Sequence, residues 1–213
     1  GRWAGRLVQL QNLPRNKMDD LAEVRELVRG GAYETLKSLH PNIPDVLSQL
    51  IRTALIARPG YHFVVSDFSA IEARVLAYLA HEDWRLAAFS RGEDIYCASA
   101  SRIYGVPVVK HGINSELRDK GKIAELALGY GGSVGAMISM GALDGGLTER
   151  ELPGLVQAWR SSNPHIVQLW EDVDRAVKRP VRYGVRSEVN GIFFFYQNQM
   201  LFIRLPSQRF LCY

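Results

Sequence analysis

The sequence predicts an α+β fold that is mainly α-helical, and three observations carry that prediction. Apolar residues recur at helical spacing through most of residues 18–178. Short apolar runs of β-favouring residues stand at 63–65 and again in the tail that begins at Val181. The chain has 213 residues, 47% of them hydrophobic and 23% charged. That composition excludes a disordered chain and suffices for a sizeable core in one or two domains.

Charge and cysteine usage narrow the class of protein. Lysine and arginine number 26 against 22 acidic residues, for a net charge of +4, which favours a polyanionic partner. Cys97 and Cys212 lack metal-ligand or redox spacing, so we expect two buried thiols in a reducing compartment. No apolar run is long enough to span a bilayer, and the chain starts without a signal-peptide pattern. We therefore expect a soluble intracellular protein.

Residues 1–17 have no sustained helical period and are expected to form extended chain and loop. Cations here alternate with amide side chains, and arginine binds phosphate while glutamine and asparagine can bond base or sugar edges. The same composition also fits an ordinary polar surface loop. Three helices are predicted next, over residues 18–30, 33–39 and 45–56, the first ending at Gly30 and Gly31.

Residues 61–80 combine a predicted strand with a predicted helix. Phe63, Val64 and Val65 form the apolar run, Asp67 follows it, and residues 71–79 carry helical spacing. A carboxylate at the end of a buried strand is held rigidly yet remains open in front, as a metal-binding or catalytic acid must be. The alternative is that Asp67 only caps the following helix.

Two further helices are predicted at 84–90 and 94–104, the second with Asp94 as its N-cap and Gly105 at its end. The His81-Glu82-Asp83 run is interpreted as an exposed polar helix end. Beyond residue 132, helices are expected at 134–140, 148–161 and 165–178. Pro153 and Gly154 should delay the start of the middle one to near Leu155.

The helix expected at 114–132 carries a row of functional side chains. Arg118, Lys122 and Leu126 are four residues apart, and Tyr130 continues the row, with Asn114 or Ser115 as the N-cap. Cations near a helix N-terminus are repelled by the positive end of the helix dipole. A bound polyphosphate would be attracted by the cations and by the dipole together. The alternatives are a solvated basic face and a Tyr130 that packs on the core.

Strands are expected to return in the tail, at Val185, Val189, 192–196 and 201–205, around an Asn190-Gly191 turn. The chain begins at Gly1 without an initiator methionine and stops at Tyr213 inside an apolar run, so we expect an internal fragment.

Several of these stretches together resemble the family A DNA polymerases, in particular the bacteriophage-like branch. Residues 67–74, DFSAIEAR, are similar to the family's first palm motif. Arg118, Lys122, Tyr130 and Gly131 match its fingers-helix motif at the same spacing. GRLVQLQNLPR precedes these motifs, GEDIY lies between them, and WRSSNP and LPSQR follow. The resemblance covers nearly the whole chain and is weakest in 18–47 and 141–154.

The resemblance implies template-directed DNA synthesis from deoxynucleoside triphosphates (dNTPs) with two Mg²⁺ ions. Asp67 would bind both ions, and the backbone carbonyl of Phe68 would help to hold the nucleotide-bound one. Arg118 and Lys122 would clamp the triphosphate, which makes these two and Asp67 the expected catalytic residues. Nucleotide contacts are further implied for Glu72, Tyr96, Leu126 and Tyr130, with Glu72 as the steric gate against ribose. DNA contacts are implied for Arg6, Gln11, Asn12, Arg15 and Gly131.

The chain departs from the family pattern at four points. Leu126 replaces a Phe or Tyr, Tyr96 replaces a His, and Gln208 replaces the glycine of LPSGR. The second catalytic carboxylate, in an HDE-like motif downstream, is absent, so we expect the isolated chain to be inactive. The alternatives are a single-subunit RNA polymerase, which Glu72 disfavours, and a non-catalytic nucleic-acid-binding half of a split or decayed polymerase.

The resemblance also implies an organisation and a setting. Residues 1–80 would form a partial palm with inserted helices at about 18–56, residues 81–180 the helical fingers, and residues 181–213 strands that return to the palm. The expected partners are primer-template DNA, dNTPs and a segment with the second carboxylate, with no membrane partner. A phage or prophage protein would act in the cytoplasm of its bacterial host.

Overall fold

The computed structural model describes Leu7 and residues 9–213, and its backbone contacts divide the chain into two compact units. The first unit is Gly1–Asp67 and the second is Phe68–Tyr213. Helices dominate both units, and a small antiparallel sheet lies in the second. The prediction of a mainly helical α+β fold is confirmed.

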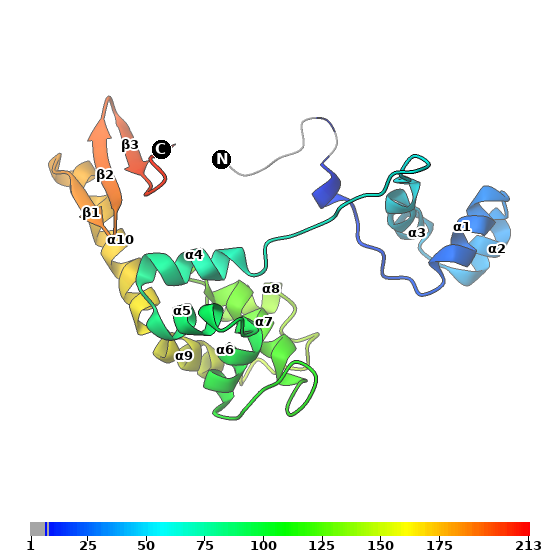
Figure 1. Cartoon of the computed structure of the whole chain (residues 1–213), viewed down its shortest axis with the longest axis horizontal. Coiled ribbons are helices and arrows are strands. Elements are labelled where there is room, and N and C mark those ends of the chain that lie inside the picture. Colours follow the sequence, from blue (N-terminus) through cyan, green and yellow to red (C-terminus); the bar gives the residue numbers. More distant parts are fainter. Residues whose placement is uncertain (1–6, 8) are drawn as a thin grey trace. The chain divides into compact units, whose positions relative to one another are not determined.

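The first unit is a small helical cluster, drawn in blue to cyan in Figure 1. Its elements are η1 (Leu10–Asn12), α1 (Leu21–Arg29), α2 (Tyr33–Leu39), α3 (Ile43–Leu50) and η2 (Ile51–Ala54). Val24, Leu36 and Val46 form its buried core. The Arg52 guanidinium donates to the carbonyls of Leu13 and Pro14, both at 2.7 Å, and so ties the opening segment to the helices. The three predicted helices are confirmed.

The strand predicted at 63–65 is wrong. Residues 61–67 contain no strand, and Phe63, Val64 and Val65 are 61, 85 and 90% exposed. A β-favouring run becomes a strand only when a neighbour accepts and donates its backbone hydrogen bonds. No described segment pairs with it, because the described sheet contains β1–β4 alone. Asp67 therefore follows an extended, exposed segment and not a buried strand.

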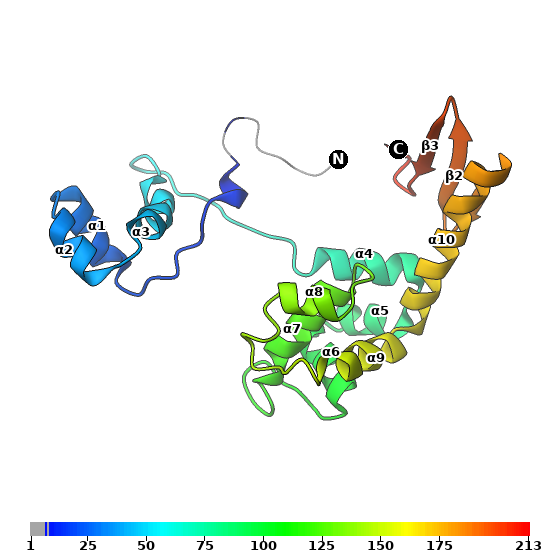
Figure 2. The same ribbon diagram turned by 180° about the vertical axis from the view of Figure 1, so that it is seen from behind.

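The second unit, whose residues are all described, contains seven helices (Figure 2). They are α4 (Ile71–Ala80), α5 (Asp83–Ser90), α6 (Ile95–Tyr104), α7 (Leu117–Leu128), α8 (Val134–Ser139), α9 (Leu152–Ser162) and α10 (Pro164–Tyr183). The largest core cluster of this unit includes five side chains that are 0% exposed: Leu128, Met137, Leu152, Trp159 and Ile166. Cys97 is buried as expected, but Cys212 is exposed.

Helix α9 begins earlier than predicted. It starts at Leu152, not near Leu155, with Pro153 in the first turn. The first backbone N–H groups of a helix have no partner inside it, so proline costs nothing there. The early start buries Leu152 and brings Trp159 into the core, where it stacks on Trp170 with ring centroids 5.9 Å apart.

The C-terminal sheet follows α10, which continues to Tyr183 and delays the first strand to Ser187. The strands β1 (Ser187–Val189), β2 (Ile192–Gln197), β3 (Met200–Arg204) and β4 (Phe210–Cys212) pair in sequence order, each antiparallel to the next. The predicted Asn190-Gly191 turn is confirmed, since both residues have positive φ. Figure 1 shows the sheet beside the C-terminal part of α10. Ile192 and Phe194 pack there with Ala176.

Replacing Gln208 by glycine is expected to stabilise the second unit. Gln208 has φ +65°, in the left-handed region. Relief of that strain, about 1–2 kcal/mol, exceeds the extra conformational entropy of glycine in the unfolded chain, about 0.5–1 kcal/mol. Denaturant unfolding should show a higher free energy of unfolding for Gln208→Gly. Ser207→Gly is the control and should lower it, because Ser207 is not among the residues with positive φ. A lower value for Gln208→Gly would contradict the strain argument.

Candidate nucleotide-binding face

The start of α7 differs from the prediction. The helix begins at Leu117 with Glu116 at the N-cap, and no side chain caps it. Asn114 lies outside the helix with φ +55°, a conformation that asparagine tolerates, and its Nδ2 donates to the carbonyl of Pro107 at 2.8 Å. The N-terminal N–H groups of α7 are thus free of side-chain caps, so Asn114 and Ser115 are wrong as caps.

The predicted row on α7 faces outward. Lys122 is exposed, Leu126 is 39% exposed and Tyr130, just beyond the helix, is 66% exposed. The buried side of the helix carries Gly121, Ala124, Glu125, Ala127 and Leu128. Packing of Tyr130 on the core is therefore excluded. The neighbouring Gly131 is exposed and has φ +78°, which favours glycine.

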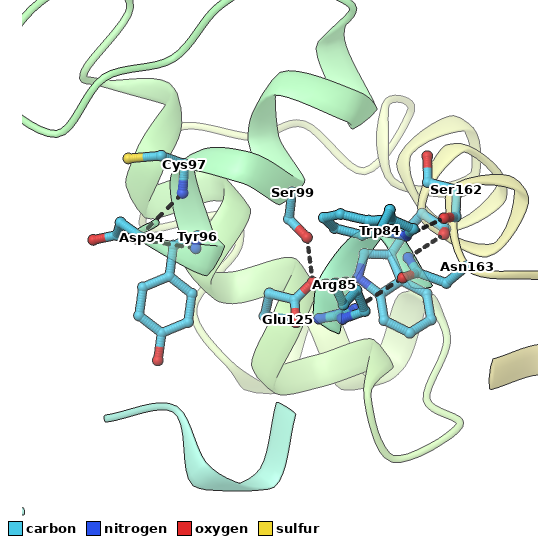
Figure 3. Close-up of polar contacts among 10 residues, drawn as sticks. Trp84, Arg85, Asp94, Tyr96, Cys97, Ser99, Glu125, Ser162 and Asn163 are labelled. Carbon is cyan, nitrogen blue, oxygen red and sulfur yellow. Dashed lines mark hydrogen bonds and ion pairs between the residues drawn. The ribbon is translucent and has the colours of Figure 1, made fainter. Parts of the chain in front are cut away.

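Arg118, the first cation of the row, is paired with Asp94. Its Nε and Nη2 atoms lie 2.9 and 2.8 Å from Asp94 Oδ2, and its guanidinium carbon lies 5.3 Å from the centre of the Tyr96 ring. Asp94 Oδ1 also accepts from the backbone N–H groups of Tyr96 and Cys97, which confirms it as the N-cap of α6 (Figure 3). One carboxylate thus caps α6 and orients a cation on α7.

The Asp94–Arg118 pair shifts both ionisations. Burial raises the pKa of Asp94, but the hydrogen bonds from Arg118 and from the Cys97 N–H outweigh it and hold that pKa below its usual value. The hydrogen bond to Asp94 raises the pKa of Arg118. Arg118 is therefore a permanent cation whose direction is set by Asp94. Sequence spacing identified Asp94 as a cap but could not reveal a partner 24 residues away.

The pair should make the second unit less stable in acid. Because the pKa of Asp94 is depressed in the fold, its contribution is complete above the unfolded value, about 3.9, and is lost as pH falls through the folded value. We expect Asp94→Asn to lower the free energy of unfolding at pH 7 and to match the unmodified chain progressively as pH falls below 4. Asp119→Asn is the control, because Asp119 lies 3.7 Å from Arg118 with a side chain 83% exposed. An Asp94→Asn deficit that is independent of pH would contradict this account.

The charge of Glu72 acts on Tyr96 within the second unit. Glu72 is exposed in the first turn of α4. Burial raises the pKa of Tyr96, and the charges of Asp94, Glu125 and Glu72 raise it further. Arg118, Tyr96 and Glu72 therefore share one electrostatic neighbourhood. Phe68, at the opposite end of the turn that leads into α4, is 74% exposed.

The turn between Phe68 and α4 is held by Arg74, a residue that sequence reasoning left without a role. Arg74 Nε donates to the Ser69 carbonyl at 2.9 Å, and its guanidinium carbon lies 4.3 Å from the centre of the Phe89 ring. Ala70 in this turn has φ +49°. These contacts attach the DFSAIEAR motif to α5.

The interpretation of residues 81–83 as an exposed helix end is wrong for Glu82. This side chain is buried, with the residue 3% exposed, and its Oε2 accepts from the backbone N–H groups of His165 and Ile166 at 2.9 and 3.3 Å. A carboxylate at the start of α10 satisfies two unpaired donors and complements the helix dipole. In the part of the chain that the structure describes, no group of three His, Cys, Asp or Glu side chains is arranged to hold a metal.

The candidate DNA contacts of the first unit are exposed where they can be described. Gln11 and Asn12 belong to η1, and Asn12 Nδ2 donates to Gln9 Oε1 at 2.6 Å. Arg15 is exposed, as is Asp67, the last residue of this unit. Arg6 lies outside the described residues. No described helix has the length and apolar character needed to cross a bilayer.

A buried polar network behind α7 was missed altogether. Arg85, Ser99, Glu125, Trp159 and Asn163 lie together in the interior of the second unit, with Glu125 on α7 at the centre (Figure 3). No local pattern in the sequence marks it, because its members come from α5, α6, α7 and the α9–α10 region.

Comparison with known proteins identifies related sequences. Residues 5–179 match the family model described as DNA polymerase family A. A DNA polymerase of Bacillus phage SP02 is 54% identical over 215 aligned positions, which cover all of this chain and 33% of that protein. DNA polymerase I of Chloroflexus aurantiacus is 42% identical over 82 positions, 36% of this chain and 9% of that protein. The thermostable DNA polymerase I of Thermus aquaticus is 35% identical over 101 positions, 45% of this chain and 12% of that protein. The chain therefore spans about a third of the phage relative.

Proposed function

The chain belongs to the family A DNA polymerases, and from that premise we propose that it supplies the fingers and part of the palm of an enzyme that extends a DNA primer under template direction. The observation that carries the proposal is the outward row on α7, which begins with two cations and ends in the exposed ring of Tyr130. In this organisation residues 1–80 contribute palm with inserted helices at about 18–56, residues 81–180 form the fingers, and residues 181–213 return to the palm.

Arg118 and Lys122 receive the triphosphate of the incoming nucleotide. The primer 3′-oxygen forms a bond to the α-phosphorus while the bond to the leaving pyrophosphate breaks, so negative charge grows on the leaving group. Two cations near a helix N-terminus stabilise that charge more than they stabilise the ground state. Asp94 supports this role because it holds the Arg118 guanidinium in one direction before the nucleotide arrives.

The sugar and base lie against the rest of the row. Tyr130 offers a π-face to the base pair that forms, and its exposure supports this role. Glu72 crowds a ribose 2′-hydroxyl and selects deoxynucleotides. Tyr96 and Leu126 stand where the family more often has a histidine and an aromatic residue, so the contacts to phosphate and sugar are less polar at Tyr96 and smaller at Leu126.

Asp67 and the backbone carbonyl of Phe68 are suited to hold Mg²⁺. Mg²⁺ prefers oxygen ligands and is bound by one or two carboxylates together with substrate phosphates, and Asp67 is an exposed carboxylate. When bound, two such ions activate the primer hydroxyl and neutralise the triphosphate. Asp67 is the acid of this chain that matches the family's first palm motif, and the proposal assigns the second acid to a further polymerase segment. We therefore propose that the isolated chain is inactive.

The proposed DNA contacts are four residues of the opening segment and Gly131. Arg6 and Arg15 bind backbone phosphates, Gln11 and Asn12 bond sugar or base edges, and Gly131 allows the template to approach closely. These assignments rest on the family resemblance, and the exposure of Gln11, Asn12 and Arg15 supports them. The similarity to a phage polymerase supports synthesis in the cytoplasm of a bacterial host.

An exchange polymerase tests the proposal. The third of the Bacillus phage SP02 enzyme that aligns with this chain is replaced by the chain itself. We expect Mg²⁺-dependent primer extension with dNTPs, lost in Asp67→Asn, whereas the 213-residue chain alone is inactive. The matched control is Asp83→Asn, which alters an exposed acid of the second unit.

Two outcomes would contradict the proposal. Extension by Asp67→Asn at the unmodified rate would remove Asp67 from the metal site, and extension by the isolated chain would show that no second acid is needed. Comparing the rates of incorporation of dNTPs and ribonucleotides distinguishes a DNA polymerase from the RNA polymerase alternative. Glu72→Ala should relax the preference for deoxynucleotides if Glu72 is the gate.

A further inference from the structure

Glu125 is a buried acid on the helix that carries the nucleotide-facing row. The residue is 6% exposed, and its carboxylate accepts from three side chains of other elements. Trp159 Nε1 donates at 2.8 Å, the Ser99 hydroxyl donates to the same oxygen, and the Arg85 guanidinium pairs with the other oxygen. Both carboxylate oxygens are therefore held from α5, α6 and α9.

Arg85, the ion-pair partner of Glu125, also has several contacts. It is 0% exposed, and its Nη1 donates to Asn163 Oδ1 at 2.9 Å. Its guanidinium carbon lies 5.2 and 5.6 Å from the ring centres of Trp84 and Trp159. Asn163, itself 0% exposed, donates to the Trp159 carbonyl at 2.7 Å. Figure 3 shows how the labelled members of the network converge behind α7.

Stability alone does not explain a buried ion pair in this place. The desolvation of two charges offsets most of their attraction, and well-packed apolar residues of similar volume stabilise a core as well or better. The network instead fixes the orientation of the helices that it joins, because each of its hydrogen bonds requires a particular angle. Registry is the best-attested use of buried polar groups of this kind.

The rest of the buried face of α7 supplies close contact but little direction. It consists of the small residues Gly121, Ala124 and Ala127 and of one large apolar side chain, Leu128, which stands at the C-terminal end. A Cβ on Gly121 would stand 2.3 Å from the Tyr96 carbonyl oxygen, so α6 and α7 touch almost backbone to backbone. The small residues of this face allow such an approach, yet they interlock little with α6 and so oppose rotation of the helix about its axis only weakly.

Glu125 lies at the edge of that face, beside the outward row. Three residues at 100° each place it about 60° around the helix axis from Lys122. A rotation of α7 that moves Lys122 therefore moves Glu125 by the same angle and breaks its three side-chain hydrogen bonds. The network therefore limits the rotation of α7 and with it the direction of the row.

We propose that Arg85 and Glu125 are positioning residues, which fix the rotation of α7 so that Arg118 and Lys122 face the triphosphate of an incoming nucleotide. They touch no substrate. The choice of triphosphate as the ligand rests on the proposed function. The rotational setting of α7, meaning the direction in which its outward row faces, can be measured without that function.

The setting of α7 is tested on the 213-residue chain by lysine acylation followed by mass spectrometry. Ser99→Ala and Trp159→Phe each remove one donor to Glu125 and retain the packing, and Glu125→Gln removes the charge. In variants shown to be folded by circular dichroism, we expect the labelling rate of Lys122 to change by about threefold or more. The rate at Lys178 on α10 should not change. Arg91→Met, which breaks an exposed pair with Glu93, is the matched control.

Catalysis is tested in the exchange polymerase. We expect the three variants to raise KM for dATP by about tenfold, the scale expected for a small misplacement of a substrate-holding group, with a smaller effect on kcat and none on DNA affinity. A purely structural role would lower Tm and leave KM of the folded enzyme unchanged. Arg85→Lys, which keeps the charge, should recover part of the loss seen in Arg85→Met.

The outcomes separate the two proposals. Unchanged Lys122 labelling in all folded variants overturns the positioning role, whether or not the exchange polymerase is active. Changed labelling together with an unchanged KM also overturns it. Changed labelling in the 213-residue chain, together with an exchange polymerase that is inactive without any substitution, supports the setting of α7 by the network and refutes the proposed function.

Discussion

Replacing Lys122 by alanine is expected to lower kcat/KM for nucleotide incorporation by the exchange polymerase about 10²–10³-fold, the loss typical of removing one preorganised donor to a developing negative charge. Lys122 is exposed on the outward row of α7. The loss should lie mainly in kcat if the lysine stabilises the leaving pyrophosphate more than the bound triphosphate. Single-turnover incorporation of dATP measures it.

Lys120→Ala is the matched control for this prediction. Lys120 lies on the same helix, two residues before Lys122, and therefore about 160° away around the axis. The Lys120→Ala variant should have a kcat/KM close to that of the unmodified enzyme. Equal losses for the two variants would mean that the total positive charge of α7 matters and not the direction of Lys122.

The largest effect on stability is expected from Trp159→Ala, at about 3–5 kcal/mol in the free energy of unfolding. Trp159 is 0% exposed and stacks on Trp170. It also donates to Glu125, which would lose a partner for a buried charge. The loss therefore combines a cavity with an unsatisfied acceptor. Urea unfolding followed by circular dichroism measures it, since tryptophan fluorescence changes with the substitution itself.

Tyr183→Ala provides the comparison for this measurement. Tyr183 ends α10 and is 71% exposed, so its removal should change the free energy of unfolding by less than about 0.5 kcal/mol. If Trp159→Ala were similarly mild, the core around α9 could not be as closely packed as the structure indicates.

The sequence predicted the helices well where capping residues and apolar spacing agree. Helix α2 has the predicted bounds, and Asp94 caps α6 as predicted. Lys122, Leu126 and Tyr130 also face outward as the four-residue spacing implies, with Arg118 partly buried at the start of the row. Each of these features depends on residues within a few positions of one another, and local spacing suffices to reveal them.

Features that depend on a distant partner were predicted wrongly or missed. The run at 63–65 favours a strand, yet a strand needs a neighbour that local sequence cannot identify. Glu82 resembled an exposed helix end, but it caps a helix that begins more than eighty residues later. Helix α9 starts earlier than the sequence predicts, because Pro153 is a first-turn residue and not an interior one.

The sequence by itself determined the family, the helical class and the identity of the side chains on the α7 row, since motif order and helical spacing are local properties of the chain. Only the tertiary structure decided how that row is held. Asp94 directs Arg118 across 24 residues, and Arg85 pairs with Glu125 across 40. Ion pairs form wherever folding brings opposite charges together, and the low dielectric of the interior then strengthens them, so their partners become visible only when the packed helices are known.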